Sequence, residues 1–384
     1  MQRIDQLNKQ PLIEIVSNKI HPKVRLNAIC PYFTMFPLSF PYKALLGAPR
    51  TATVYDPFCG RGTTNYAARL LGLSSVGVDS NPVAHAIAQA KLIQARPAEI
   101  RARCLDILEE EATPPIPEGE FWQLAYHRQT LEAICKIRVY MLGKSRLDRI
   151  DVALRAIVLG ILHGPRMKTQ DSYLSNQMPR TFSTKPDYSV RYWKKHGLLP
   201  SQQDLVSLVF RKAGYTFNEQ LPEKVAGKIV LADSRKVGSL SGTRFDRVIT
   251  SPPYFGMTTY EQDQWLRNWF LGGPEKVDYC CKSQLKHGSE AGFIQDLASV
   301  WANTARKCRP GAVLISRFGA LPSKSDKTPA MLMKESLALA DCGWRVQTIR
   351  SAGHPVDSKR QSNQMSGGSA SYVDEIDVYA ILNT

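Results

Sequence analysis

Short apolar runs that end in polar or glycine-containing sequence recur along the chain and predict buried β-strands. The expected strands lie at residues 53–56, 75–79, 228–233, 244–249, 312–316, 344–350 and 376–382. Apolar residues at helical spacing predict helices at 83–95, 293–308 and 329–341, and the residues at 309–311 read as a turn. This alternation predicts an α/β fold with an open seven-stranded sheet, which binds ligands at the carboxyl ends of its strands.

The alternation is interrupted after the second strand, where residues 96–225 read mostly as helices. Helices are expected at 100–111, 120–141 and 151–163, with an acidic, proline-rich linker at 109–117. We therefore expect a large, mainly helical insertion at 96–225. It divides an α/β domain into residues 51–95 and 226–384, and residues 1–50 form an N-terminal segment ahead of it.

The first strand runs into a glycine-rich turn that opens a helix, from Asp56 to Thr64. Gly60 and Gly62 allow the backbone to approach a ligand closely where a Cβ would clash. The spacing is not the complete G-x-G-x-x-G of dinucleotide sites, and no lysine follows that could hold a triphosphate. The second strand ends in Asp79, which is placed to accept from ribose hydroxyls. These features favour a nucleoside without a phosphate tail as the ligand.

The fourth strand runs into the sequence Thr250-Ser251-Pro252-Pro253-Tyr254. The two prolines fix φ and remove two backbone donors, so nearby carbonyls can act as acceptors in a rigid pocket. Such a pocket suits an exocyclic amino group, which would donate to Ser251 and to a backbone carbonyl while Tyr254 offers a flat face for the ring. Positioning would then do most of the catalytic work. A simple proline-rich turn after a strand has the same local sequence and stays open as an alternative.

Together, Asp56-Pro57-Phe58-Cys59-Gly60-Arg61-Gly62-Thr63 and Ser251-Pro252-Pro253-Tyr254 resemble the cofactor loop and the catalytic motif of S-adenosylmethionine-dependent DNA amino-methyltransferases. The resemblance covers residues 27–90 and 226–384 and implies a class I, Rossmann-like methyltransferase sheet that closes with an antiparallel hairpin. In that family a serine at the first motif position is typical of cytosine-N4 enzymes. The resemblance therefore implies methyl transfer from S-adenosyl-L-methionine to the N4 amino group of cytosine in double-stranded DNA, with the base flipped out of the helix.

The resemblance also assigns roles to particular residues. Ser251, Pro252, Pro253 and Tyr254 form the catalytic motif, and the expected cofactor-binding residues are Phe36, Asp56, Phe58, Gly60, Gly62, Thr63, Asp79, Ser80, Asp233 and Ser234. The aromatic segment 31–37, which includes Phe36, packs beside the methionine part of the cofactor in that family. An aromatic-rich helix that covers the sheet edge is an equally good interpretation of this segment. Asp233 would accept from the adenine amino group.

The charge and composition of the chain narrow the range of possible functions further. The net charge of +16 over 384 residues indicates a polyanionic partner. No apolar run is long enough to span a membrane and no signal peptide is present, so we expect an intracellular, cytoplasmic protein. The 8 cysteines contain no C-x-x-C pair, which indicates reduced thiols and no metal. No Pro-Cys dipeptide supplies the thiolate that methylation at cytosine C5 requires.

The middle of the insertion interleaves basic and aromatic residues, a pattern that can neutralise phosphates and stack on bases. The expected DNA contacts are Arg180, Lys185, Arg191, Tyr192, Lys194 and Lys195 in the insertion, with Lys359 and Arg360 in the loop 351–374. A solvated basic face over a local aromatic core would show the same pattern. A companion restriction endonuclease is a candidate partner.

Three other functions share most of these features: an adenine-N6 DNA methyltransferase, a guanine-N2 RNA methyltransferase, and a DNA-binding protein that retains an inactive methyltransferase scaffold. The RNA enzyme usually has an aspartate where Ser251 stands. The inactive scaffold is disfavoured by the intact motifs.

Overall fold

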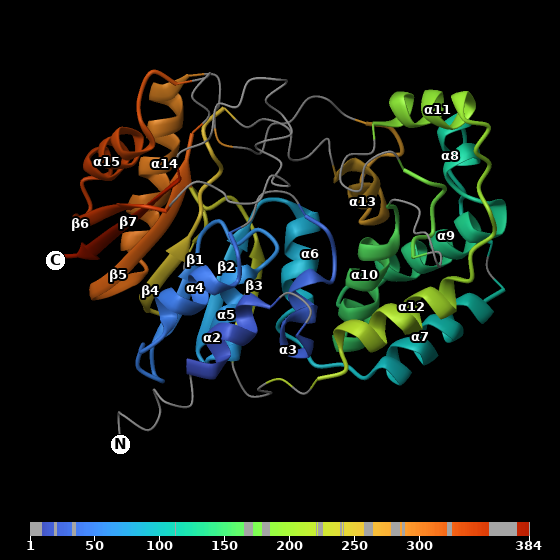
Figure 1. The fold of residues 1–384 in the computed structure, drawn as a ribbon, viewed down its shortest axis with the longest axis horizontal. Coiled ribbons are helices and arrows are strands. Elements are labelled where there is room, and N and C mark those ends of the chain that lie inside the picture. Colours follow the sequence, from blue (N-terminus) through green and yellow to red (C-terminus); the bar gives the residue numbers. More distant parts are fainter. Residues whose placement is uncertain are drawn as a thin grey trace.

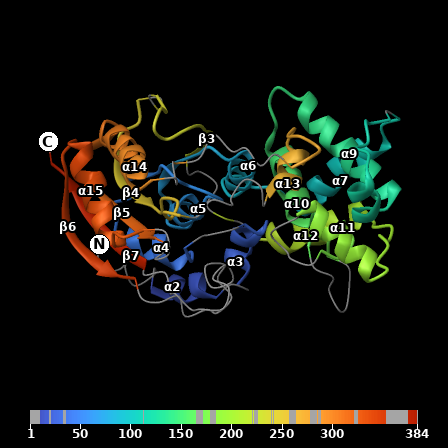
Figure 2. The ribbon, with the colours of Figure 1, turned by 90° about the horizontal axis from the view of Figure 1, so that it is seen from above.

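The computed structural model describes residues 10–18, 21–32, 36–111, 113–164, 172–178, 185–219, 221, 226–238, 240, 242–256, 264–277, 285, 289–320, 325–352 and 375–383. A sheet with its covering helices lies beside a group of helices, and both views show this arrangement (Figures 1 and 2).

One seven-stranded sheet has the order β3-β2-β1-β4-β5-β7-β6. Its strands are β1 (Thr53–Asp56), β2 (Ser74–Asp79), β3 (Gly227–Leu231), β4 (Phe245–Thr250), β5 (Cys308–Gly319), β6 (Trp344–Ser351) and β7 (Glu375–Leu382). The strands β3, β2, β1, β4 and β5 pair in parallel, whereas β7 runs antiparallel to both β5 and β6. The predicted fold class, an open α/β sheet that closes with an antiparallel pair, is confirmed.

Alternate residues of the strands face two separate layers of helices, as the period of two in a strand requires. Val54, Ile249 and Ile315 pack with α4 (Ser39–Leu45), α5 (Thr63–Leu70) and α6 (Pro82–Ala90). Their neighbours Tyr55 and Val248 pack with α14 (Glu290–Ala305) and α15 (Pro329–Ala340). The central strands are therefore covered on both faces, and ligands can reach them only at their ends.

The helices between β2 and β3 form most of the second part of the molecule, which we call the helical lobe. It consists of α7 (Pro97–Glu109), α8 (Glu120–Ala125), α9 (Arg128–Gly143), α10 (Arg149–Ile161), α11 (Pro186–Lys195) and α12 (Leu205–Thr216), joined by α13 (Trp265–Phe270) from the segment after β4. Trp269 and Phe270 of α13 are each 1% exposed, as their apolar character predicts, and Arg138 Nε of α9 donates to the Trp269 carbonyl at 2.8 Å. The helical lobe thus includes a segment that directly follows the proposed catalytic motif. Short helices α2 (Gln10–Ser17) and α3 (Pro22–Arg25) and the 3-10 turn η1 (Leu26–Ala28) precede α4.

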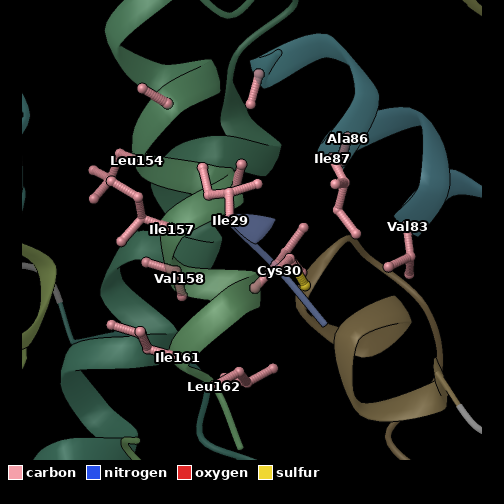
Figure 3. Close-up of a cluster of buried hydrophobic side chains, with 14 of the residues drawn as sticks. Ile29, Cys30, Val83, Ala86, Ile87, Leu154, Ile157, Val158, Ile161 and Leu162 are labelled. Carbon is pink, nitrogen blue, oxygen red and sulfur yellow. The ribbon is translucent and has the colours of Figure 1, made fainter. Parts of the chain in front are cut away.

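The helical lobe packs directly on the sheet's own helices. Figure 3 shows Val83, Ala86 and Ile87 of α6 opposite Ile157, Val158 and Ile161 of α10, with Ile29 and Cys30 between them. This contact requires Gly160, because a Cβ there would lie 2.2 Å from the Ile29 carbonyl oxygen. The helical lobe and the sheet layer share one continuous apolar cluster. The boundaries that we expected for the insertion stay a prediction.

Two expected elements differ from the structure. The prediction of a turn at 309–311 is wrong, because these residues belong to β5. An irregularity in the β4–β5 register accommodates Pro310 and Gly311 within the strand. The single helix expected at 120–141 is divided into α8 and α9 at Tyr126, which is extended and buried and whose hydroxyl donates to the Leu162 carbonyl at 2.9 Å. A tertiary hydrogen bond therefore accompanies a break that the local apolar spacing did not indicate.

Candidate functional site

The glycine-rich turn and the serine-proline motif leave the sheet at the same edge. The parallel strands β1 and β4 are neighbours, with Tyr55 opposite Val248, so both chains emerge at the carboxyl end of the pair. Thr250 Oγ1 donates to Asp56 Oδ1 at 2.6 Å and joins the two turns at their bases. The two segments that the sequence analysis placed in one site therefore begin side by side.

Two aspartates organise the glycine-rich turn. Asp79, at the end of β2, accepts from the Gly60 N–H at 2.8 Å and from the Asn81 N–H at 2.9 Å. Gly60 and Gly62 have φ of +50° and +75°, in the left-handed region that favours glycine. A Cβ on Gly62 would also lie 2.8 Å from the Ala88 Cβ of α6, whereas a Cβ on Gly60 would meet nothing within 4 Å. The close approach that requires glycine at 62 is therefore to α6, a contact that the sequence did not indicate.

Asp56 lies beneath the turn with 1% of its surface exposed. Its Oδ1 accepts from Thr250 and from the Phe58 N–H at 3.1 Å, and its Oδ2 has no hydrogen-bond partner. Burial raises the pKa of Asp56 to about 6, although hydrogen bonds from neighbouring groups favour the charged form. An unfilled, buried acceptor at the edge of a sheet is costly in isolation and suits a donor from a bound molecule.

The serine-proline motif is held by aromatic packing. Pro252 is buried, and Ser251, Pro253 and Tyr254 are partly exposed. The Tyr254 ring lies edge-on to Phe318 of β5, with centroids 6.0 Å apart, and Phe255 forms a parallel bridge with Ala320. The motif therefore continues the β4–β5 pairing beyond the sheet and presents Tyr254 in a defined orientation.

Phe36 lies near β5, the strand that carries Phe318. Its ring is 5.1 Å from Phe40, and the Arg317 guanidinium lies 4.0 Å over the Phe40 ring. Arg317 is held by two 2.8 Å bonds to the carboxylate of Asp377, and it is close enough to Tyr254 to interact electrostatically. Sequence reasoning missed Phe40, Arg317 and Asp377, because nothing in their local sequence indicates that they converge.

The end of β3 is tied to the glycine-rich turn. Ser234 Oγ donates to the Pro57 carbonyl, and the Ala232 N–H donates to the Asp79 carbonyl at 3.0 Å. The Asp233 carboxylate accepts from the Arg235 guanidinium, which also bonds Asp296 at 2.9 Å. The pKa of Asp233 is lowered overall, since these bonds outweigh the opposing effect of burial.

The remaining predicted cofactor residues border the same turn. Thr63 begins α5 and is 3% exposed, Phe58 is partly buried with its ring 6.5 Å from Trp301, and Ser80 is partly buried beside Asp79. All predicted cofactor residues therefore belong to β1, β2 and β3, the turns that follow them, the first residue of α5, or the segment ahead of α4.

The predicted DNA contacts in the insertion lie on or beside α11. Lys185, Arg191, Lys194 and Lys195 are exposed, and Tyr192 is partly buried with its ring 4.6 Å from His196. Lys194 forms an ion pair with Glu120 of α8. Trp193, by contrast, is fully buried and donates to the Gln177 carbonyl at 2.6 Å. Arg180, Lys359 and Arg360 lie outside the described residues.

The described part of the chain contains no cluster of three or more histidine, cysteine or acidic side chains that could hold a metal ion. Within the same residues, no helix is both long and apolar enough to cross a membrane. The cysteines at 30, 59, 104, 135, 308 and 342 are free thiols.

The strand order and the antiparallel β7 match the class I methyltransferase sheet expected from the sequence, and this match concerns the fold alone. The chain is 23% identical over 251 residues to the Type II methyltransferase M.BsoBI of Geobacillus stearothermophilus, and the match covers 60% of this chain and 49% of that protein. The chain thus spans about half the length of this curated relative. No protein-family model matches.

Solved structures with a likeness to the chain are distant. The rRNA methyltransferase aviRa from Streptomyces viridochromogenes superposes with a TM-score of 0.35 at 15% identity, over 92% of this chain and 87% of its own. TrmN from Thermus thermophilus superposes with a TM-score of 0.35 at 10% identity, over 94% of this chain and 52% of its own. A likeness at this level carries no information about substrates.

Proposed function

We propose that the protein transfers a methyl group from S-adenosyl-L-methionine to the N4 amino group of cytosine in double-stranded DNA. The observation that carries the proposal is the Thr250–Asp56 hydrogen bond, which joins the serine-proline motif and the glycine-rich turn at one sheet edge. Similarity to a protein named as a Type II methyltransferase supports the methyl-transfer part of the proposal.

The residues of the glycine-rich turn fit the nucleoside and amino-acid parts of the cofactor. Asp56 Oδ2 is a buried acceptor without a donor, and Gly60 leaves open space where a Cβ would stand. Asp79 and Asp233 would accept from the ribose and from the adenine amino group. Their carboxylates already accept bonds from the protein, but each oxygen can accept more than one. When bound, S-adenosylmethionine supplies an electrophilic methyl carbon.

The residues of the serine-proline motif position the target. Ser251 and a neighbouring carbonyl accept from the amino group, so the lone pair of its nitrogen is directed away from the pocket wall. Tyr254, oriented by Phe318, stacks on the flipped base. Flipping costs a few kcal/mol and is offset by this stacking and hydrogen bonding. With the cofactor bound, the amine nitrogen held by Ser251 would form a bond to the methyl carbon as the carbon–sulfur bond breaks. S-adenosylhomocysteine would leave as a neutral thioether, and the extra proton on the nitrogen would pass to solvent.

The exposed basic residues of the helical lobe support the proposal that DNA is the substrate. Exposed Lys185, Arg191, Lys194 and Lys195 form a basic strip on and beside α11, which lies along the outer part of the helical lobe (Figure 1). The chain as a whole carries a net charge of +16. Cations in this number can hold a phosphate backbone by counterion release. We propose that α11 contributes to the choice of target site.

The test is methylation of duplex DNA with labelled S-adenosylmethionine, followed by digestion to nucleosides and mass spectrometry. The proposal expects N4-methyldeoxycytidine. N6-methyldeoxyadenosine would leave the mechanism intact but correct the target base. Product on transfer RNA but not on DNA would replace the substrate class. Calorimetry that detects no binding of S-adenosylmethionine would indicate an inactive scaffold.

A further inference from the structure

Arg61 stands between the two glycines of the glycine-rich turn, and its side chain is folded inward. The residue is 7% exposed, yet its guanidinium makes no hydrogen bond or ion pair with any described residue, and its Nε is buried without a partner. A guanidinium has five N–H donors and a charge that does not titrate in the physiological range. A buried charge of this kind costs several kcal/mol unless something compensates it.

The surroundings of Arg61 add positive charge. Lys91, fully buried at the end of α6, donates to the neutral Asn27 side chain at 2.8 Å. Arg267 of α13 is also fully buried, and it donates to the Leu159 carbonyl and the Gln264 side chain at 2.9 and 2.7 Å, while its Nη2 has no partner. All three cations lie close enough to Cys30 to act on its thiol electrostatically. No carboxylate among the described residues pairs with any of them.

A ligand in the proposed cofactor site would lie near enough to supply the missing counter-ion, because Arg61 belongs to the turn that borders this site. Gly62, the next residue, caps the amino end of α5, where the helix dipole also favours negative charge. Burial lowers the pKa of Arg61 to about 10, which is the expected sign for a cation held without an anion.

We propose that Arg61 binds the α-carboxylate of the methionine part of S-adenosylmethionine. This inference rests on the proposed function. That function places the ribose and the adenine near Asp79 and Asp233, at the β2 and β3 side of the turn. The amino-acid end then lies nearer the glycine-rich turn itself, where Arg61 stands between Gly60 and Gly62 and is close enough to Cys30 to act on its thiol electrostatically. A planar carboxylate accepts two parallel bonds from a guanidinium.

The test compares S-adenosylmethionine with its decarboxylated analogue, which carries an aminopropyl group in place of the methionine part. By titration calorimetry, the unmodified protein should prefer the carboxylate form by roughly 10- to 100-fold, the range of hydrogen bonds between charged groups. In Arg61→Met the preference should fall to within about threefold, while affinity for the decarboxylated form stays unchanged, because methionine fills the same space without the donors.

Thermal unfolding without ligand gives a second readout. Because Arg61 is unpaired, Arg61→Met should keep or raise Tm. The matched control is Arg69→Met, also in this region. Arg69 is 3% exposed but donates to the Lys91 and Ile93 carbonyls at 2.8 Å, so its loss should lower Tm and leave the carboxylate preference intact.

The outcomes separate this inference from the proposed function. If the unmodified protein binds S-adenosylmethionine but Arg61→Met keeps the preference, or unfolds at a lower temperature, Arg61 is structural and the inference is overturned while the function stands. If the unmodified protein binds neither compound, the proposed function fails and the inference falls with it.

Discussion

The two ends of the β1–β4 strand pair each carry an aspartate that bridges the strands, but the two carboxylates differ in burial and in hydrogen bonding. At the amino end, Asp246 Oδ2 accepts from the Thr53 N–H and from Arg309 Nη1, both at 2.8 Å, and from the Thr53 hydroxyl at 3.0 Å. At the carboxyl end, Asp56 is buried, accepts on one oxygen and leaves the other unfilled. Hydrogen bonds lower the pKa of Asp246 despite partial burial, whereas burial raises that of Asp56 to about 6.

The difference separates an end whose carboxylate is paired within the chain from the end at which we propose that the cofactor binds. One end satisfies its charges within the chain. The other leaves Asp56 Oδ2 and the Arg61 guanidinium without partners, which costs stability unless a ligand supplies them. Proteins depart from complete satisfaction of polar groups mainly at functional sites.

The largest effect should come from the motif above Asp56. Ser251→Ala and Tyr254→Ala should each lower the methylation rate about 100-fold or more, because positioning of the amine is lost. Binding of S-adenosylmethionine should change no more than a few-fold. Tyr254→Phe, which keeps the ring, is the control and should retain most of the activity.

Radiolabel transfer to DNA and calorimetry measure the two quantities separately. If both are lost together in Ser251→Ala and Tyr254→Ala, the motif is a structural turn, and the contrast between the two ends of the sheet no longer concerns function.

The two aspartates should respond oppositely to neutralisation at pH 7.5. Asp56→Asn removes a buried charge and should stabilise the ligand-free protein by up to about 3 kcal/mol, which corresponds to a shift of about two pKa units. Asp246→Asn loses bonds between charged groups and should destabilise it by about 1 to 3 kcal/mol.

The pH dependence of the free energy of unfolding distinguishes the two aspartates. Between pH 4 and pH 6 the native state of the unmodified protein binds more protons at Asp56 than the unfolded state does, so its stability falls as pH rises through this window. The gain from Asp56→Asn should therefore disappear on going down to pH 4. The loss from Asp246→Asn should persist there and shrink only at lower pH, since the pKa of Asp246 is depressed. Denaturant unfolding at several pH values measures both, and a parallel response of the two variants would contradict the comparison.

The packing of the helical lobe on the N-terminal segment can be tested through Gly160. A Cβ there would lie 2.2 Å from the Ile29 carbonyl oxygen, so Gly160→Ala should destabilise the protein by about 1 to 3 kcal/mol. A Cβ on Gly214, inside α12, would meet nothing within 4 Å, and Gly214→Ala should stabilise by about 0.5 to 1 kcal/mol. Equal effects of the two changes, measured by Tm, would mean that the helical lobe does not depend on this contact.

The sequence predicted the sheet well because its strands are continuous apolar runs, and it predicted which turns share one edge because parallel strands align their carboxyl ends. It failed where long-range contacts decide. Pro310 and Gly311 read as a turn but lie in a strand, and α12 was not predicted as a separate helix. Nothing in the local sequence indicates that the Arg61 guanidinium lacks a hydrogen-bond partner, since a sequence does not show which charges will be unpaired in three dimensions.

The smallest expected effect concerns α11, far from both ends of the strand pair. Replacing Arg191, Lys194 and Lys195 together with glutamate should weaken duplex binding about tenfold at low salt and reduce the slope of log affinity against log salt, because fewer counterions are released. Lys194 already pairs with Glu120, so its share of the effect should be the smallest of the three.

The matched control reverses the charge of exposed Lys43, Lys334 and Arg345, which lie on α4, α15 and β6, away from the helical lobe (Figure 1). Both triple variants change the net charge equally, so fluorescence anisotropy that finds equal weakening would attribute binding to overall charge. An unchanged affinity in the α11 variant would refute its role in binding DNA.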